Sequence, residues 1–133
     1  MPFVFADQGT IIKDMGMGTF GGKTYHVLEV RYQAGVGYSS EDDFVVFIDP
    51  KTDRLALIHH SVTESPDVER VTWVFDDWQR VSGLIIPARM TFYSGWNPDD
   101  PGKGASFTVE NAQLSTQAPN PAIYNPPAGA VIE

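Results

Sequence analysis

Residues 69–93 read ERVTWVFDDWQRVSGLIIPARMTFY and decide the fold, because they predict two long amphipathic strands joined by a tight turn. Apolar side chains recur at every second position in both halves, which is the period of a strand that buries one face. Gly83 suits the turn, since glycine takes positive φ without steric cost. Pro87 has no amide hydrogen and predicts an edge, a bulge or a bend at its position. The residues on the apolar face are Val71, Trp73 and Phe75 in the first strand and Leu84, Ile86, Ala88, Met90 and Phe92 in the second.

The rest of the chain shows the same pattern of strands and turns. The segment 44–48, FVVFI, is apolar at every position, which predicts a central strand covered on both faces. In the next segment Leu55 and Leu57 alternate with Ala56 and Ile58, so both faces are apolar and a bulge or double-sided burial is predicted. The further strands are expected at residues 9–20, 24–33, 43–48, 54–62 and 105–116.

A single turn of helix is expected near the C-terminus. Asn120 has a side chain that can cap this turn, and Pro121 suits the first helical position. We expect Ile123 and Tyr124 on this turn to plug one end of the sheet. No other segment has the period of a useful amphipathic helix. The predicted fold class is therefore all-β, an antiparallel meander of about seven strands that forms a curved sheet or half-barrel.

The length of the chain, 133 residues, is enough for one hydrophobic core, so residues 1–133 are predicted to form a single β domain. Without helices, the sheet must bury its apolar face by rolling into a barrel, by folding into two layers, or against another subunit. Residues 2–6, PFVFA, resemble a strand or arm cut from something longer. A fragment of a longer envelope protein is therefore a second interpretation of the chain.

The chain is acidic, with a formal net charge of -8 and a pI of about 4.6. Such a charge repels a phosphate backbone or an anionic membrane, so no nucleic-acid partner is expected. The absence of cysteine excludes disulfides and thiolate metal sites. No run of about eighteen apolar residues predicts a transmembrane segment, and residues 1–7 lack the basic start and the length of a signal peptide.

His59, His60 and Asp77 are the candidates for catalytic chemistry. Neighbours on a strand point to opposite faces, so the two histidines do not ligate one ion unless a bulge intervenes. We expect no metal site and no cofactor, because no ligand spacing is diagnostic. The patterns of serine hydrolases, zinc proteases, phosphate loops and dinucleotide-binding folds are also absent. A small β-barrel enzyme of hydrolase type, using His and Asp residues, is thus the alternative to a protein without catalysis.

The aromatic side chains predict a different kind of site. An apolar cavity with a few polar residues at its mouth has the usual composition of a site for a small ligand. Burial in an ordinary core is the competing interpretation. The predicted ligand-binding residues are Trp73, Phe75, Met90 and Phe92, with His60 and Arg89 at the mouth.

Four segments of the chain resemble a bacterial family of unknown function whose members are typically longer and secreted or lipoprotein-like. The most specific pieces are the turn Asp49-Pro50-x-Thr52, the spacing from Trp78 through Gly83 to Pro87, and the ending at 123–130. The resemblance covers nearly all of the chain. The segments are GGKTYHVLEVRY (21–32), DDFVVFIDPKTDRLAL (42–57), FDDWQRVSGLIIPARMTFY (75–93) and SFTVENAQLSTQAPNPAIYNPPAGAVIE (106–133).

That family is similar to the lipoprotein-carrier superfamily of LolA, LolB and LppX. The resemblance implies a curved antiparallel sheet that wraps an apolar cavity for acyl chains, in the periplasm or cell envelope. This chain departs from the pattern, since it matches only the C-terminal half of the longer members and lacks the helices that cover the LolA cavity. Two half-barrels can cover each other's apolar faces, so the departure favours a homodimer.

The expected function is therefore a LolA-like binding module for an apolar ligand, an acyl chain or a lipidated partner. A purely structural dimerisation domain is the second interpretation, and an enzyme is the third.

Overall fold

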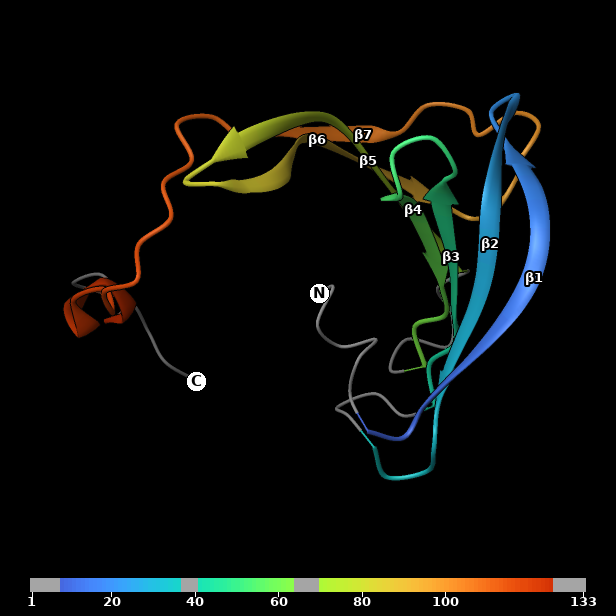
Figure 1. Ribbon diagram of the computed structural model, residues 1–133, viewed down its shortest axis with the longest axis horizontal. Helices are drawn as coiled ribbons and strands as arrows, with labels where there is room; N and C mark the ends of the chain where they lie inside the picture. Colours follow the sequence, from blue (N-terminus) through green and yellow to red (C-terminus); the bar gives the residue numbers. More distant parts are fainter. Residues whose placement is uncertain (1–7, 37–40, 64–69, 126–133) are drawn as a thin grey trace.

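The computed structural model describes residues 8–36, 41–63 and 70–125 (Figure 1). Over these residues the chain forms one sheet of seven strands, paired in chain order and antiparallel throughout. The predicted all-β meander is confirmed. The elements are β1 (Thr10–Phe20), β2 (Lys23–Tyr32), β3 (Phe44–Asp49), β4 (Arg54–His60), β5 (Val71–Val81), β6 (Leu84–Ser94), β7 (Ala105–Thr108) and the 3-10 turn η2 (Pro121–Tyr124).

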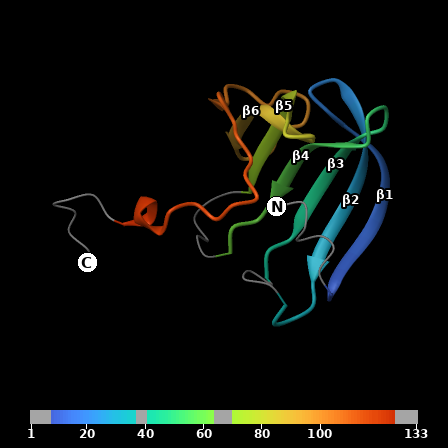
Figure 2. The same cartoon turned by 60° about the vertical axis from the view of Figure 1, so that its left-hand side comes forward.

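The sheet is open and strongly curved. In Figures 1 and 2, β1 to β4 stand side by side, and the β5–β6 hairpin extends from them as an arm. Two hairpins turn through two residues that both have positive φ: Gly21 and Gly22 between β1 and β2, and Ser82 and Gly83 between β5 and β6. Turns of this kind match the right-handed twist of the strands they join.

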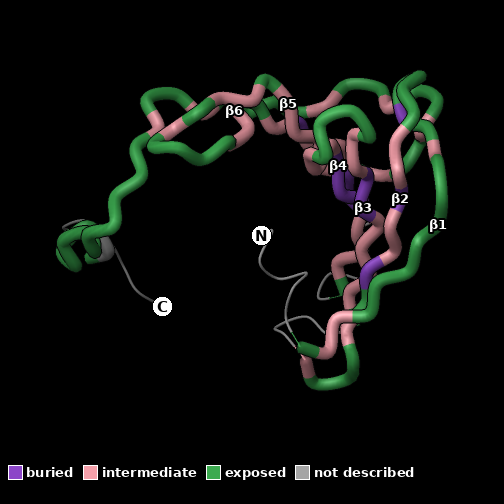
Figure 3. Tube along the Cα trace, in the orientation of Figure 1, coloured by how far each residue is buried: buried purple, intermediate pink, exposed green. Residues whose placement is uncertain are grey.

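The middle of the sheet is covered on both faces. Val46 and Phe47 are neighbours on β3 and point to opposite faces, yet both are almost completely buried. The face of Phe47 carries a core formed with Phe20, Val27 and Leu57. Figure 3 shows the buried residues gathered mainly on β2, β3 and β4. The apolar run in β3 thus behaves as predicted.

Trp96, in the loop after β6, closes the curve of the sheet. Its ring lies 5.3 Å from that of Phe20 at the end of β1 and 5.6 Å from that of Phe47, measured between centroids. The amide of Gly21 also donates a 2.7 Å hydrogen bond to the carbonyl of Pro98. The β1–β2 turn and the loop after β6 belong to strands that do not pair, so these contacts hold the sheet in its curl (Figure 1).

Two local irregularities follow the sequence. Phe47 pairs with Leu57, whereas Ile48 pairs with Leu55, so Ala56 is an extra residue in β4 and the predicted bulge is present. Pro87 pairs with β5 on one side only, because β7 begins to pair with β6 at Arg89. The proline therefore occupies a free edge, as its missing amide hydrogen requires.

The end of the chain differs from the prediction. β7 stops at Thr108 instead of continuing to residue 116, and Asn111 shortly after it takes a left-handed φ of 53°. The expected helical turn is present, with the Asn120 side chain accepting a 3.0 Å hydrogen bond from the amide of Ala122. It does not plug the sheet through Ile123, which is 64% exposed and lies on a segment that leaves the sheet (Figure 2). The Tyr124 side chain and residues 126–133 lie outside what the structure describes.

Leu57→Ala is expected to lower the free energy of unfolding by about 2–5 kcal/mol, because Leu57 is fully buried in the core and its loss leaves a cavity. Urea denaturation followed by circular dichroism measures this change. The matched control, Leu84→Ala, removes a side chain that is 60% exposed and should change stability by less than about 0.5 kcal/mol. Equal effects of the two substitutions would contradict this description of the core.

Candidate functional site

The predicted apolar residues lie together on one face of β5 and β6. Trp73 is directly opposite Phe92, and Phe75 is directly opposite Met90. The rings of Trp73 and Phe92 are 5.1 Å apart, and the ring of Phe107 on β7 lies 5.9 Å from that of Trp73. We call Trp73, Phe75, Met90, Phe92 and Phe107 the aromatic patch. Its grouping follows from strand period, but Phe107, which is half-exposed, was missed as a member.

The two polar residues predicted at the mouth of that site are placed differently: His60, opposite Val71, shares a sheet face with Trp73, and Arg89 lies on the other face. His60 stacks on Phe44 with 5.3 Å between ring centroids, and its Nδ1 donates to the carbonyl of Ser61 at 2.8 Å. Arg89 lies on the opposite face from its neighbour Met90, where it pairs with Asp76 at 2.7 Å and Asp77 at 3.1 Å. These carboxylates, Asp76 first, raise the pKa of Arg89. Arg89 is therefore turned away from the aromatic patch, whereas His60 is on the same face but contacts Phe44 and Ser61.

His59 is buried on the opposite face from His60, as strand geometry predicts. Its Nδ1 lies 3.0 Å from the hydroxyl of Thr72, and its ring lies 4.3 Å from that of Trp96. Burial, helped by the positive charge of Arg70, lowers the pKa of His59 from 6.5 to about 4. The ring is therefore neutral at pH 7, and it packs against the ring of Trp96.

The candidates for catalysis are not brought together. Asp77 takes a left-handed φ of 50° on the exposed part of β5 and pairs with Arg89. On β5, Asp77 lies six residues after Val71, which pairs with His60. Six residues of strand span about 20 Å, so Asp77 and His60 are far apart. In the part of the chain that the structure describes, no group of three or more His, Asp and Glu side chains is placed to hold a metal ion.

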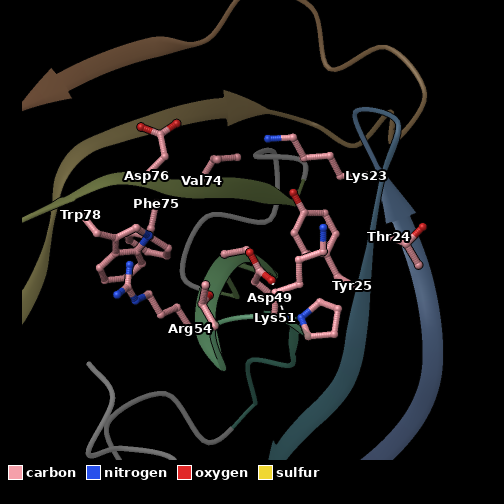
Figure 4. Close-up of a pocket in the computed structure, with 13 residues that line it drawn as sticks. Lys23, Thr24, Tyr25, Asp49, Lys51, Arg54, Val74, Phe75, Asp76 and Trp78 are labelled. Atoms are coloured by element: carbon pink, nitrogen blue, oxygen red, sulfur yellow. Dashed lines mark hydrogen bonds between the residues drawn. The ribbon is translucent and has the colours of Figure 1, made fainter.

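A pocket of about 740 Å³ lies between the start of β2, the β3–β4 turn and β5 (Figure 4). Only Phe75 is shared with the aromatic patch. Apolar and polar side chains line it in similar number. The apolar lining consists of Tyr25, Pro50, Ala56, Val74, Phe75 and Trp78, and the polar lining of Lys23, Thr24, Asp49, Lys51, Thr52, Arg54 and Asp76.

The pocket is built on the core of the sheet. Tyr25 and Val74 pack against the buried cluster, and the ring of Tyr25 meets that of Phe47 edge-on at 6.1 Å. On the other side the guanidinium of Arg54 lies over the ring of Trp78, 5.6 Å from its centroid, within the range of a cation–π contact. Figure 4 shows this pair across the pocket from Tyr25.

The β3–β4 turn supplies the floor between these two walls. The carboxylate of Asp49 accepts a 2.8 Å hydrogen bond from the amide of Lys51, which fixes the turn locally. Burial, and then the charge of Asp49, raise the pKa of the Tyr25 phenol. Tyr25 therefore stays a neutral hydrogen-bonding group at physiological pH.

Sequence reasoning missed this pocket although it identified its parts. The Asp49-Pro50 turn and the strands on both sides of it were predicted. The contact of Arg54 with Trp78 depends on how β4 pairs with β5, which the alternation of residues in a single strand does not predict. A basic residue directly after a turn and a tryptophan on a strand were the only local signals.

The chain was compared with known proteins. The model of a family of unknown function, DUF6503, matches residues 1–71, which is more than half of the chain. No curated protein and no solved structure matches. A family of unknown function is thus found, as expected, but nothing links it to the LolA superfamily, and the match stops short of the segments at 75–93 and 106–133.

No helix among the residues that the structure describes has the length and apolar character needed to cross a membrane.

His59 makes the stability of the protein depend on pH. Its pKa is 6.5 when unfolded and about 4 when folded, so the unfolded state binds the proton first as the pH falls. The stability is complete above pH 6.5 and is lost down to pH 4, by about 3 kcal/mol for this group. Urea denaturation at several pH values measures the loss.

His59→Gln keeps a polar partner for Thr72 and should flatten this pH dependence between pH 6.5 and 4. The matched control is His60→Gln, on the opposite face, which should leave the dependence as it is in the unmodified protein. A pH profile that is identical in all three proteins would contradict the role given to His59.

Proposed function

The chain belongs to DUF6503, a family of unknown function, and we propose that it is a binding module for a small apolar or amphipathic molecule, with no chemistry of its own. The ligand occupies the pocket between β2, the β3–β4 turn and β5. The aromatic side chains Tyr25 and Trp78 form its two walls.

The observation that carries the proposal is the pocket itself. Its volume of about 740 Å³ falls within the roughly 300–1,000 Å³ of pockets that bind small molecules. Such pockets combine an apolar lining with a few polar groups that orient the ligand, and this one has both. It is also attached to the most buried part of the sheet through Tyr25 and Val74, so its walls are preorganised.

A binding role is favoured over catalysis by the positions of the titratable groups. His59 is packed in the core, His60 lies on the other face, and Asp77 is held by Arg89. None of the three lines the pocket. The pocket carboxylates, Asp49 and Asp76, each serve as acceptors for a neighbouring donor in the protein.

The finer form of the proposal is a LolA-like carrier of acyl chains or lipidated partners in the periplasm or cell envelope. Its support is the resemblance of the sequence and the single curved antiparallel sheet, which is the architecture that a carrier of this kind would need. In this form the aliphatic chain of the ligand lies along Trp78 and Phe75.

Binding of N-phenyl-1-naphthylamine, a neutral dye that becomes fluorescent in apolar surroundings, tests the proposal. We expect saturable binding that Trp78→Ala weakens about tenfold or more, since the variant loses a large aromatic wall and the partner of Arg54. Trp73→Ala is the matched control, because it removes the same side chain from the aromatic patch and should change the affinity little.

The controls separate the possible failures. If Trp73→Ala abolishes binding and Trp78→Ala does not, the ligand site is the aromatic patch and the pocket assignment is wrong. If the unmodified protein, checked for folding by circular dichroism, binds no dye, the binding function itself is contradicted.

A second candidate, the homodimer, is favoured by the free edge of the sheet. All four residues of β7 are exposed, and Phe107 is 50% exposed beside Trp73. An uncovered strand edge with an apolar neighbour is a template for pairing with a second copy. We propose that two chains associate there, as a structural role or alongside ligand binding.

Size-exclusion chromatography with light scattering measures the oligomer directly. We expect a dimer mass for the unmodified chain and a monomer mass for Phe107→Glu, because a charge at the edge opposes pairing. Ile123→Glu, at another exposed apolar residue, is the control and should leave the mass unchanged. A monomer at high micromolar concentration for the unmodified chain would contradict the dimer.

A further inference from the structure

The cations of this acidic chain are unevenly distributed. Of its nine Lys and Arg residues, all within the described ranges, Arg31, Arg70 and Arg89 form salt bridges with described carboxylates. Three of the other six line a single pocket, although the chain as a whole carries a net charge of -8. These three are Lys23, Lys51 and Arg54, which we call the pocket cations.

Two acids, Asp49 and Asp76, line the same pocket, and neither forms a salt bridge with these cations. Asp49 accepts from the backbone amide of Lys51, and Asp76 accepts from Arg89 Nε at 2.7 Å. Among the described residues no carboxylate lies within salt-bridge distance of a pocket cation. The lining residues include three cations and two carboxylates, and Asp76 is already paired with Arg89, so the pocket carries an excess of positive charge.

The pocket cations come from three elements that surround the same space. Lys23 lies at the start of β2, Lys51 in the β3–β4 turn, and Arg54 at the start of β4. Figure 4 shows Lys23 and Arg54 on opposite sides, with Lys51 between them. An anionic group that enters the pocket would be approached from several directions.

Of the three pocket cations, Arg54 is the one best preorganised to bind an anion. Its guanidinium lies over the ring of Trp78, 5.6 Å from the centroid, and a cation–π contact leaves the hydrogen bonds of the guanidinium N–H groups unused. Those groups match the two oxygens of a carboxylate or phosphate in a bidentate arrangement. The same contact brings the charge next to the apolar wall formed by Trp78, so a charged head and an apolar chain are accommodated side by side.

We infer that the pocket selects an amphiphile with an anionic head group, whose carboxylate or phosphate binds the pocket cations and whose aliphatic chain packs against Trp78. This inference rests on the proposed function and adds to it the charge of the ligand. It also explains how a chain of net charge -8 takes up an anion, since the local charge differs in sign from the total.

Isothermal titration with four ligands of equal chain length, each below its micelle concentration, tests the inference: dodecanoate, dodecyl phosphate, dodecanol and dodecyltrimethylammonium. We expect both anions to bind at least tenfold more tightly than the alcohol and the cation to bind most weakly. The preference should shrink as salt is raised, because salt screens exposed charges. The ratio of the dissociation constants of dodecanoate and dodecyl phosphate shows which of the two head groups the site binds more tightly.

Arg54→Gln should remove most of the preference for the anions, so that dodecanoate and dodecanol bind with similar affinity. Lys51→Gln, in the turn, should act in the same direction if it folds normally. The matched control is Arg31→Gln, which removes a cation that Glu29 already neutralises and should alter no affinity.

The outcomes of these titrations distinguish a failure of the anionic head group from a failure of the proposed binding function. If dodecanol binds as tightly as dodecanoate, the anionic head group is wrong while apolar binding stands. If Arg54→Gln keeps the preference for the anions, the head group does not bind Arg54 and the assignment to the pocket cations is wrong. If none of the four ligands binds to the folded protein, the proposed binding function fails and the inference fails with it.

Discussion

The packing of Trp96 against Phe20, Phe47 and His59 is the constraint on which the shape of this protein depends. A sheet of seven strands that no helix covers among the described residues has to bury apolar side chains by bending on itself. The loop after β6 does this by placing an aromatic ring between the end of β1 and the centre of β3 and β4. The neutral state of His59 belongs to the same constraint, because burial disfavours the charged imidazole more than the nearby Asp43 favours it.

The pocket depends on the curvature of the sheet. Tyr25 and Val74 face the core that the curl creates, so the wall of the pocket and the core of the fold are one continuous layer. The Asp49 turn and the pairing of β4 with β5 then place Arg54 above Trp78. The aromatic patch on β5, β6 and β7 is distinct from this arrangement. Its residues are partly exposed and end at a free strand edge, which favours association of chains over enclosure of a small molecule.

Much of the fold was predictable because its information is local. Strand period placed β5 and β6, glycine placed the turns around Gly21 and Gly83, and the run at 44–48 identified the strand that is buried on both faces. The early end of β7 at Thr108 was not predictable from the alternation of apolar and polar residues, which continues beyond it. The packing of Trp96 against β1 and β3 was not predictable, because Trp96 lies in a loop rich in glycine and proline that has no repeating pattern of apolar residues.

The site was less predictable than the fold, for the same physical reason. Trp73, Phe75, Met90 and Phe92 were correctly grouped, because cross-strand neighbours in a hairpin are fixed by its turn. The pocket unites residues from β2, β4 and β5, and its charge is apparent only when the partners of each cation are known.

A crystal structure of the protein grown with dodecanoate tests the central claim most directly. The account predicts a carboxylate within hydrogen-bond distance of the Arg54 guanidinium and an aliphatic chain lying along Trp78. A ligand seated on Trp73 and Phe107, or a pocket that stays empty at saturating dodecanoate, would contradict it.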